Sequence, residues 1–520
     1  MKVLLVTGQL ATEVVSTYAK QSPIETEVVT LKTAVAAFLT PKAIIESLKN
    51  KKNLTSFNLI LTPGLLRGDT AAITHALGIP AYKGPKYAAD LSVVLDLLGE
   101  VKLSTTTPAD ELLQQQLTAK ALAEIEKVEN QRTILLKNPG NMLVGGVAVG
   151  KDFPLRVLAE IVDAALMDKE TVQQIARRFA LAGADFIDVG MAAGESQPQK
   201  AAQLIHWVRE VTNLPVSIDS LDPEEINAAV KAGAQLVLSA DAGNLDAIAP
   251  FIKDIPLVVI PTNQNIGYIP KNVSERVQFL EQIITKAQSL GVNNILADLI
   301  LDPQEILNSF LAFKEFAQKN PAVPLFVGIS NVTELFDADS VGLNAVLTRL
   351  SAEISGGILL ATEKSNKAKG TVAEEVIAAK MMFLAKKRNS IPKDLGIDLL
   401  ILKDKRAHEE PYNRNIETLA KCVIIAPEKV EPALLDHLGT FRIFIDHIDH
   451  LIVAIHYSMN NPNEPLNVIK GKTAQAVYAK ILEMGIVSKL DHSAYLGNEL
   501  TKAEIALRTD KNYLQDTAIF

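Results

Sequence analysis

Residues 182–190 read Ala-Gly-Ala-Asp-Phe-Ile-Asp-Val-Gly, and residues 215–220 read Pro-Val-Ser-Ile-Asp-Ser. Each stretch is a short apolar run that follows a turn signal and reaches a carboxylate, a pattern typical of a strand buried in a parallel sheet. A further turn signal, Ala-Gly-Ala at 232–234, follows after one helix length. This succession predicts alternating strands and helices in the middle of the chain.

The same rhythm extends on both sides of these runs. Strands are expected at 142–149, 185–189, 215–218, 235–239, 256–260, 293–297, 324–328 and 356–361. Helical patterns lie between or after them, at 171–182, 222–232, 272–290, 302–318 and 371–388. Eight strands, each followed by a helix, over about 250 residues is the count of a (β/α)8 TIM barrel. An open doubly wound sheet is the alternative, but eight nearly even units favour the barrel.

The chain on either side of the barrel has a different pattern. Residues 1–100 predict a small parallel α/β (Rossmann-like) domain, residues 101–138 a helical linker, residues 139–390 the barrel and residues 391–520 an α+β domain. Strands are expected in the first domain at 2–7, 26–31 and 57–62, with a helix at 41–48. In the last domain, strands are expected at 399–402, 422–425, 442–446 and 451–457, and helices at 473–484 and 498–508.

Composition narrows the class of protein. The chain has 520 residues, 60 of them acidic and 52 basic, and its net charge of −8 argues against a nucleic-acid partner. The single cysteine, Cys422, is expected in the core of a strand, and one cysteine excludes disulfide frameworks and thiolate zinc sites within one chain. No apolar run is long enough to span a membrane, and the first residues read as a buried strand rather than a signal peptide. A cytoplasmic protein with no membrane partner is expected.

Polar side chains follow the expected barrel strands at their carboxyl ends, where barrels carry their active sites. They are Asp188, Asp219, Ser239, Asn263, Asp298 and Asn331. Carboxylates at one mouth suit Mg²⁺ or Mn²⁺, and they also suit a pterin, whose pyrimidine edge presents adjacent N–H and NH₂ donors to one carboxylate. An Asp at a strand end is also often the N-cap of the next helix, which is the interpretation for Asp222.

These residues and motifs resemble dihydropteroate synthase and the pterin-binding methyltransferases that share its fold. The whole chain is similar to archaeal and methylotroph dihydropteroate synthase-related proteins, in which a short α/β domain with motifs like those at 6–8 and 62–69 precedes the barrel. A tail with a motif like that at 490–500 follows it. The resemblance implies that Asp219 and Asp298 bind the pterin and that Ser239 stands where the family usually has Asn. Asn263 is expected to line the same site.

At two strands the sequence differs from dihydropteroate synthase, and these differences bear on whether the chain catalyses condensation or methyl transfer. The resemblance requires a Ser-Arg-Lys run on strand seven and Arg-x-His on strand eight for the departing pyrophosphate, but this chain has Ser-Asn-Val-Thr at 330–333 and only Glu363-Lys364. Lys151, Arg156, Lys364 and Lys367 are the candidates for a substitute clamp. The segment 328–332 instead resembles pterin-dependent methyltransferases, in which the Asn hydrogen-bonds near the pterin N5. An amide donor there stabilises charge as a methyl group leaves, so Asn331, with Asp188, is the expected catalytic residue.

The expected function is that of a transferase acting on a reduced pterin, tetrahydromethanopterin or tetrahydrofolate, in one-carbon or methyl transfer. A dihydropteroate synthase-like C–N condensing enzyme of methanopterin or folate biosynthesis, which would use Mg²⁺, is the first alternative. A non-catalytic pterin-binding or scaffold protein is the second. A homodimer is expected by analogy with the family.

The tail also resembles segments fused to corrinoid methyltransferase components. The resemblance implies that His492 is the candidate corrinoid ligand. It also implies that a corrinoid or methyl-acceptor protein is the candidate partner. The other interpretation of His492 is structural, since it can pack against the Tyr-Leu-Gly that follows at 495–497. The histidines at 447 and 450 would point to opposite faces of a strand, so solvated turn residues are expected there and no metal site is predicted.

Overall fold

The computed structural model describes residues 1–192, 194–405, 412–427, 435–461 and 463–520. The chain forms two compact units, one of residues 1–124 with 394–426 and the other of residues 125–393 with 427–520. Within the described ranges no helix combines the length and apolar character needed to cross a membrane. The predicted domain boundaries at 100, 138 and 390 stay predictions.

Eight parallel strands form a closed barrel in the second unit. They are β7 (Arg156–Ile161), β8 (Phe186–Gly190), β9 (Val216–Asp219), β10 (Leu236–Ala240), β11 (Leu257–Val259), β12 (Ile295–Ala297), β13 (Leu325–Val327) and β14 (Gly356–Thr362). Each strand pairs with the next along the chain, and β14 pairs with β7 to close the ring. The predicted TIM barrel is confirmed.

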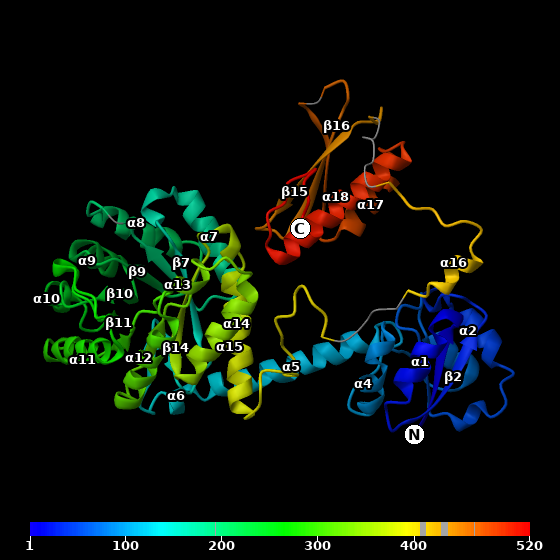
Figure 1. The fold of residues 1–520 in the computed structure, drawn as a ribbon, viewed down its shortest axis with the longest axis horizontal. Coiled ribbons are helices and arrows are strands. Elements are labelled where there is room, and N and C mark those ends of the chain that lie inside the picture. The colour runs from blue at the N-terminus through cyan, green and yellow to red at the C-terminus, as the bar shows by residue number, and fades with distance from the viewer. Residues whose placement is uncertain (193, 406–411, 428–434, 462) are drawn as a thin grey trace. The chain divides into compact units, whose positions relative to one another are not determined.

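Helices surround this barrel, as Figure 1 shows in the cyan to yellow part of the chain. They are α7 (Lys169–Ala182), α8 (Pro198–Arg209), α9 (Pro223–Ala232), α10 (Leu245–Ile248), α11 (Val273–Ser289), α12 (Ile306–Lys319), α13 (Ser330–Thr333), α14 (Ser340–Glu353) and α15 (Thr371–Lys387). Helix α9 shows how local sequence sets their ends. The Asp222 carboxylate accepts hydrogen bonds from the backbone N–H groups of residues 224 and 225, and Gly233 ends the helix with φ 103°. Asp222 is therefore an N-cap, as predicted.

The prediction that residues 142–149 form the first barrel strand is wrong. They form a hairpin of β5 (Asn141–Val144) and β6 (Val147–Gly150). Gly145 and Gly146 connect these strands with φ 53° and 88°, the positive values that a tight two-residue hairpin turn requires. The first barrel strand is β7, which begins only at residue 156. Two apolar strands follow each other here, and the local pattern does not distinguish which one enters the barrel.

The hairpin closes the amino end of the barrel. Its Val144 and Val149 pack in one cluster with apolar side chains that point into the barrel, namely Leu158, Phe186, Leu236, Leu238, Val258, Leu296, Phe326 and Ile358. Because side chains alternate along a strand, the next inward positions of β7 and β8 are Glu160 and Asp188, which are partners in the strand register. The interior therefore changes from apolar at the amino end to acidic at the carboxyl end.

The first unit contains a parallel sheet of order β2-β1-β3-β4, made of β1 (Lys2–Gly8), β2 (Glu25–Leu31), β3 (Leu59–Thr62) and β4 (Ala81–Lys83). Its helices include α1 (Thr12–Ala19), α2 (Pro41–Leu48), α3 (Ala71–Leu77) and α4 (Leu91–Asp96). A cavity of about 360 Å³ lies where β1 and β3 end, and its lining includes Thr7, Thr62 and Tyr18. The helices α5 (Ala109–Asn130) and α6 (Arg132–Leu135) follow and account for most of the predicted linker.

The C-terminal part of the second unit is an antiparallel sheet covered by two helices. The strands are β15 (Thr440–Asp446), β16 (Leu451–Tyr457) and β17 (Pro465–Gly471), and the helices are α17 (Ala474–Glu483) and α18 (Leu490–Thr509). They share an apolar core of their own that includes Phe441, Ile452 and Leu500. Residues 447–450 form the turn between β15 and β16, as predicted. The strand β17 was not predicted.

Three other expectations for residues 391–520 fail. Residues 399–402 and 422–425 are not strands, and Cys422 is exposed rather than part of the core. Apolar runs of four residues form strands only where a neighbouring strand completes their hydrogen-bond ladder. No described strand pairs with either segment.

Candidate active site

Three carboxylates meet at the carboxyl end of the barrel. One oxygen from each of Glu160, Asp188 and Asp219 lies within 4.8 Å of the other two. They belong to β7, β8 and β9, whose parallel pairing aligns Glu160 with Asp188 and Asp188 with Ser217. We call Glu160, Asp188 and Asp219 the carboxylate cluster.

A glycine makes room for the cluster. The residue after Val189 on β8 is Gly190, and a Cβ atom built at this position would collide with Oε1 of Glu160. Gly190 therefore allows the Glu160 side chain to turn across β8 toward Asp188. Any larger residue at position 190 would push that carboxylate away.

Asp188 is the deepest member of the cluster. Its side chain is fully buried, and Oδ1 accepts a hydrogen bond from the hydroxyl of Ser217 on the next strand. The other oxygen, Oδ2, is buried and accepts no hydrogen bond from the described residues. Buried polar atoms in folded proteins nearly always have a partner, so this oxygen is available to a ligand.

Burial and mutual repulsion raise the pKa of all three carboxyl groups. Burial raises the pKa of Glu160 to about 8, with further contributions from the charges of Asp219 and Asp163. Burial, followed by the charges of Asp219 and Glu160, raises the pKa of Asp188. Burial raises the pKa of Asp219 to about 6. Such shifts are typical of functional sites because carboxylates are placed there without a neutralising partner.

Asp298 stands at the same mouth, directly after β12. Burial raises its pKa to about 7, the Ile300 N–H and the charge of Arg276 oppose this shift, and the charge of Asp219 adds to it. Its Oδ1 accepts the backbone N–H of Ile300 at 2.7 Å. Ile300 has φ 62°, a conformation that a β-branched residue rarely adopts, so the loop after β12 is held in a strained form beside the site.

The two acidic residues expected to bind a pterin are therefore brought together, and neither is the N-cap of a helix. Asp219 is half-buried, and its carboxylate accepts no hydrogen bond from any residue that the structure describes. Asp298 uses one oxygen in a local turn and keeps the other free of such contacts. Their roles in binding a pterin stay predictions.

The three neutral candidates lie on β10, in the segment after β11 and on the short helix α13 that follows β13. Ser239 is half-buried near the end of β10. Asn263 exchanges backbone hydrogen bonds of 3.0 Å with Tyr268, and its side-chain Oδ1 is buried without a described partner. Asn331 is the second residue of α13 and is exposed; among the described residues its amide makes only a long contact of 3.4 Å, with the Leu301 carbonyl. All three side chains keep polar atoms that a ligand can contact.

The four basic residues considered as a pyrophosphate clamp do not lie together around the mouth. Arg156 is the first residue of β7, at the amino end of the barrel, where it pairs with Glu129 at 2.7 Å, and Lys151 precedes it. Lys364 and Lys367 follow β14, but they pair with Asp163 and Asp337, each at 2.7 Å. Arg156 and Lys151 therefore cannot reach a ligand at the mouth.

Sequence reasoning missed Glu160. The error in placing the first strand hid it, because Glu160 lies well beyond 142–149. The alternation in Arg-Val-Leu-Ala-Glu-Ile at 156–161, with Leu158 and Glu160 on one side, was the signal that would have found it.

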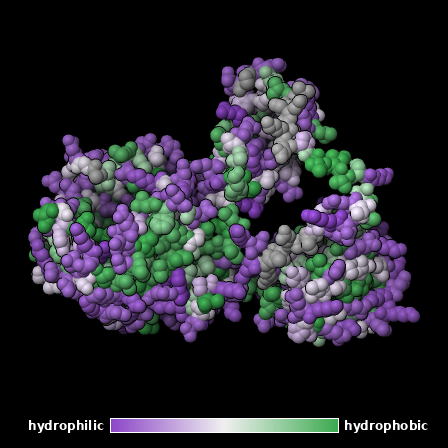
Figure 2. Space-filling view, in the orientation of Figure 1, coloured by the Kyte–Doolittle hydropathy of each residue, from purple (hydrophilic) through white to green (hydrophobic). Residues whose placement is uncertain are grey.

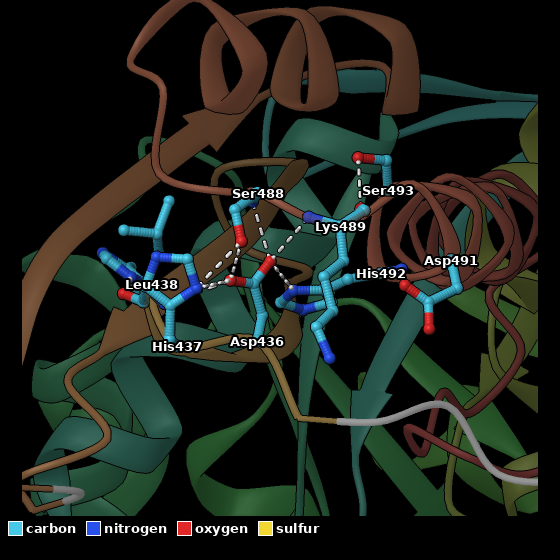
Figure 3. Close-up of polar contacts among 9 residues, drawn as sticks. Asp436, His437, Leu438, Ser488, Lys489, Asp491, His492 and Ser493 are labelled. Carbon is cyan, nitrogen blue, oxygen red and sulfur yellow. Dashed lines mark hydrogen bonds and ion pairs between the residues drawn. The ribbon is translucent and has the colours of Figure 1, made fainter.

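His492 lies on α18, in the C-terminal part of the chain. Asp436, buried just before β15, accepts hydrogen bonds from the Ser488 hydroxyl at 2.6 Å, the Ser488 N–H at 2.8 Å and Nδ1 of His492 at 3.1 Å (Figure 3). These donors hold the pKa of Asp436 well below its usual range despite its burial. His437 contacts the same Ser488 hydroxyl at 3.2 Å. The Asp436 carboxylate thus fixes the His492 ring through Nδ1 and leaves Nε2 as its acceptor atom.

Comparison with known proteins gives matches along the chain. Residues 161–361 match the family described as pterin binding enzyme, residues 435–516 match PterinBD-DUF4346, and residues 1–86 match a family of unknown function, DUF6513. An uncharacterised protein of Methanocaldococcus jannaschii is 39% identical over 100% of this chain and 99% of its own length. A Ycf91-like protein of Nostoc is 33% identical over 16% of this chain and 84% of its own.

Solved dihydropteroate synthases are also similar to this chain. The Yersinia pestis enzyme with a pterine-sulfa conjugate has 17% identity and a TM-score of 0.38, over 48% of this chain and 99% of its own. The Xanthomonas albilineans enzyme in complex with 7,8-dihydropteroate has 20% identity and a TM-score of 0.39, over 49% of this chain and 100% of its own.

Proposed function

Because the chain belongs to the dihydropteroate synthase-related family of its full-length Methanocaldococcus jannaschii relative, with a barrel of the pterin-binding kind, we propose that it is a transferase acting on a reduced pterin. The proposed reaction is one-carbon or methyl transfer with tetrahydromethanopterin or tetrahydrofolate. The proposal includes a cytoplasmic location.

One observation carries this proposal: Asp219 ends β9 and Asp298 follows β12, so both stand at the carboxyl end of the barrel, and neither forms an ion pair with a described Lys or Arg. A pterin offers an apolar ring face together with an edge of adjacent N–H and NH₂ donors. A carboxylate accepts both donors in a two-pronged pair, which discriminates against rings that lack them. Asp298 is the proposed partner of that edge, with Asp219, Ser239 and Asn263 lining the rest of the pterin site.

Two features favour methyl transfer over condensation: the candidate cations are not available to hold a pyrophosphate, and an amide stands at the mouth. A departing pyrophosphate needs cationic side chains around it in addition to any Mg²⁺, because its charge is spread over several oxygens. Lys364 and Lys367 are already paired, and Arg156 lies at the far end of the barrel. Asn331, by contrast, has an exposed amide that can donate a hydrogen bond to a pterin N5 without a charge. Asp188 is its proposed catalytic partner.

Ligand titration tests the proposal. The purified chain is expected to bind tetrahydromethanopterin or tetrahydrofolate by calorimetry, and Asp219→Ala is expected to abolish that binding while the thermal melt stays cooperative. Asp222→Asn is the matched control, because it removes a carboxylate from the same barrel end and Asn remains a good N-cap. Unchanged affinity in Asp219→Ala would reject the site. Pyrophosphate release from a pterin diphosphate would favour the condensing alternative, and binding without any transfer would favour the scaffold alternative.

His492 is the proposed ligand of a corrinoid, which would supply a methyl-accepting cobalt on this chain or on a partner protein. The observation that favours it is the pairing with Asp436: a carboxylate on Nδ1 fixes the tautomer and orients Nε2 for a metal, as outer-shell carboxylates commonly do. Titration with hydroxocobalamin is expected to change the cobalt absorption spectrum, and His492→Gln is expected to abolish that change. An identical spectrum with both proteins would reject the assignment.

A homodimer is part of the same proposal. Leu335, Phe336 and Val346, on and just before α14, are exposed at 67%, 39% and 59%. Figure 2 shows apolar surface over the part of the barrel that carries α13 and α14. A patch of this kind is typical of an interface. Analytical ultracentrifugation is expected to give a dimer, and Val346→Glu is expected to give a monomer.

A further inference from the structure

The carboxylate cluster concentrates negative charge without a protein counter-charge. Among the residues that the structure describes, no Lys or Arg pairs with Glu160, Asp188 or Asp219. The cation whose charge acts on Glu160, Lys364, is exposed and pairs with Asp163 at 2.7 Å. Three carboxylates within 4.8 Å repel one another strongly in a buried setting unless protons or a cation neutralise them.

The deepest carboxylate also has an unused oxygen. The Ser217 hydroxyl holds Oδ1 of Asp188, so the orientation of the carboxylate is fixed before any ligand arrives. Its Oδ2 is buried and has no hydrogen-bond partner among the described residues. A buried acceptor without a donor is unfavourable because it has lost its hydrogen bonds to water, and a ligand that contacts it removes this cost.

We propose that Glu160, Asp188 and Asp219 bind one hard divalent cation, Mg²⁺ or Mn²⁺, on the floor of the barrel mouth. All donors are carboxylate oxygens, with no imidazole or thiolate in the cluster, and this donor set suits Mg²⁺ and Mn²⁺ rather than Zn²⁺ or Cu²⁺. Three protein ligands leave about three positions of an octahedral shell for water or for a substrate oxygen. The site goes beyond the proposed function, since it is expected to fill without a pterin.

Electron paramagnetic resonance of Mn²⁺ tests this proposal on the full chain without pterin. After chelator treatment, the protein is expected to bind one Mn²⁺ per chain with loss of the free-ion signal, and excess Mg²⁺ is expected to restore that signal. Glu160→Gln and Asp188→Asn are expected to weaken Mn²⁺ binding by at least about tenfold. Glu160 is only half-buried, so its variant serves if Asp188→Asn does not fold.

Two control variants separate the cluster from its surroundings. Asp163→Asn removes a nearby carboxylate that is paired with Lys364, and Asp298→Asn removes the proposed pterin partner. Both are expected to bind Mn²⁺ within about twofold of the unaltered protein, because charges outside the ligand set contribute little. Asp298→Asn is expected to lose pterin affinity at the same time, so failure of the cation site and failure of the pterin site give different results.

A steric variant tests the geometry without removing a ligand. Gly190→Ala places a Cβ against Oε1 of Glu160 and is expected to weaken Mn²⁺ binding at least about tenfold while all three carboxylates remain. Absence of Mn²⁺ binding by the unaltered protein at millimolar concentration would overturn the proposal. So would Mn²⁺ binding that Glu160→Gln and Gly190→Ala both leave unchanged.

Discussion

Replacing Asp298 with Asn is expected to weaken pterin binding and to reduce its pH dependence. The substitution keeps the size of the side chain and one oxygen for the Ile300 N–H. It removes the negative charge and replaces the other acceptor by an NH₂ group. That group would face the donors of the pterin edge, so the two-pronged pair is lost.

The magnitude follows from the hydrogen bonds and from the pKa. A hydrogen-bonded pair to a charged group contributes about 1.5–3 kcal/mol, which corresponds to a dissociation constant about 10- to 150-fold higher in Asp298→Asn at pH 8. Burial raises the pKa of Asp298 to about 7. The carboxyl group is thus about nine-tenths ionised at pH 8 and about one-tenth ionised at pH 6. Because only the ionised form accepts both donors, the affinity of the unaltered protein is expected to fall about tenfold from pH 8 to pH 6.

Calorimetric titration with tetrahydrofolate and tetrahydromethanopterin at both pH values measures this effect. Asp222→Asn is expected to keep the affinity and pH ratio of the unaltered protein, because Asp222 caps α9 instead of facing the mouth. Asp298→Asn is expected to show weaker binding and a much smaller pH ratio. The reasoning is refuted if Asp298→Asn binds as tightly as the unaltered protein at pH 8, or if both proteins show the same pH ratio.

Three further predictions concern turnover and stability. Asn331→Ala is expected to lower the transfer rate by about tenfold or more and to change the pterin dissociation constant much less, because the amide acts on N5 in the transition state. Equal losses of the rate, measured by stopped flow, and of the affinity, measured by calorimetry, would contradict this. Phe186→Ala is expected to lower the free energy of unfolding by about 3–5 kcal/mol in urea titrations, since the ring is fully buried in the barrel interior, and a loss below about 1 kcal/mol would show that the site repacks. Burial raises the pKa of Glu374 in the folded protein to about 7, from 4.5 in the unfolded chain. Its contribution to the free energy of unfolding is therefore complete below pH 4.5 and is lost as the pH rises through 7. Glu374→Gln is therefore expected to reduce the fall in unfolding free energy between pH 5 and pH 8 by up to about 3 kcal/mol, and an unaltered fall would show that other groups cause it.

The sequence predicted the elements whose signals are local. Thr40 caps α2 by accepting the N–H of Ala43 at 3.3 Å, as its place before Pro41 indicated. Asp222 caps α9 for the same reason. The position of Asp219 and Asp298 at the same end of the barrel was predictable one step further, because all strands of a barrel end at one mouth.

Where two segments compete for one place, the sequence did not decide. Residues 142–149 and 156–161 are both apolar and strand-forming, and only the closure of the ring by β14 and β7 shows which one is the barrel strand. The prediction chose the hairpin, and Glu160 was lost with it. The runs at 399–402 and 422–425 were apolar enough for strands, but a strand also needs a paired neighbour, which a sequence window does not contain.

By itself, the sequence determined the barrel repeat, the helix caps and the acidic strand ends, because each depends on residues within a few positions of one another. Only the tertiary structure decided that Glu160 joins Asp188 and Asp219, and that Asp436 holds His492 from 56 positions away. These arrangements depend on which segments the folded chain brings into contact, and contact between distant residues follows from packing the whole unit rather than from any local pattern.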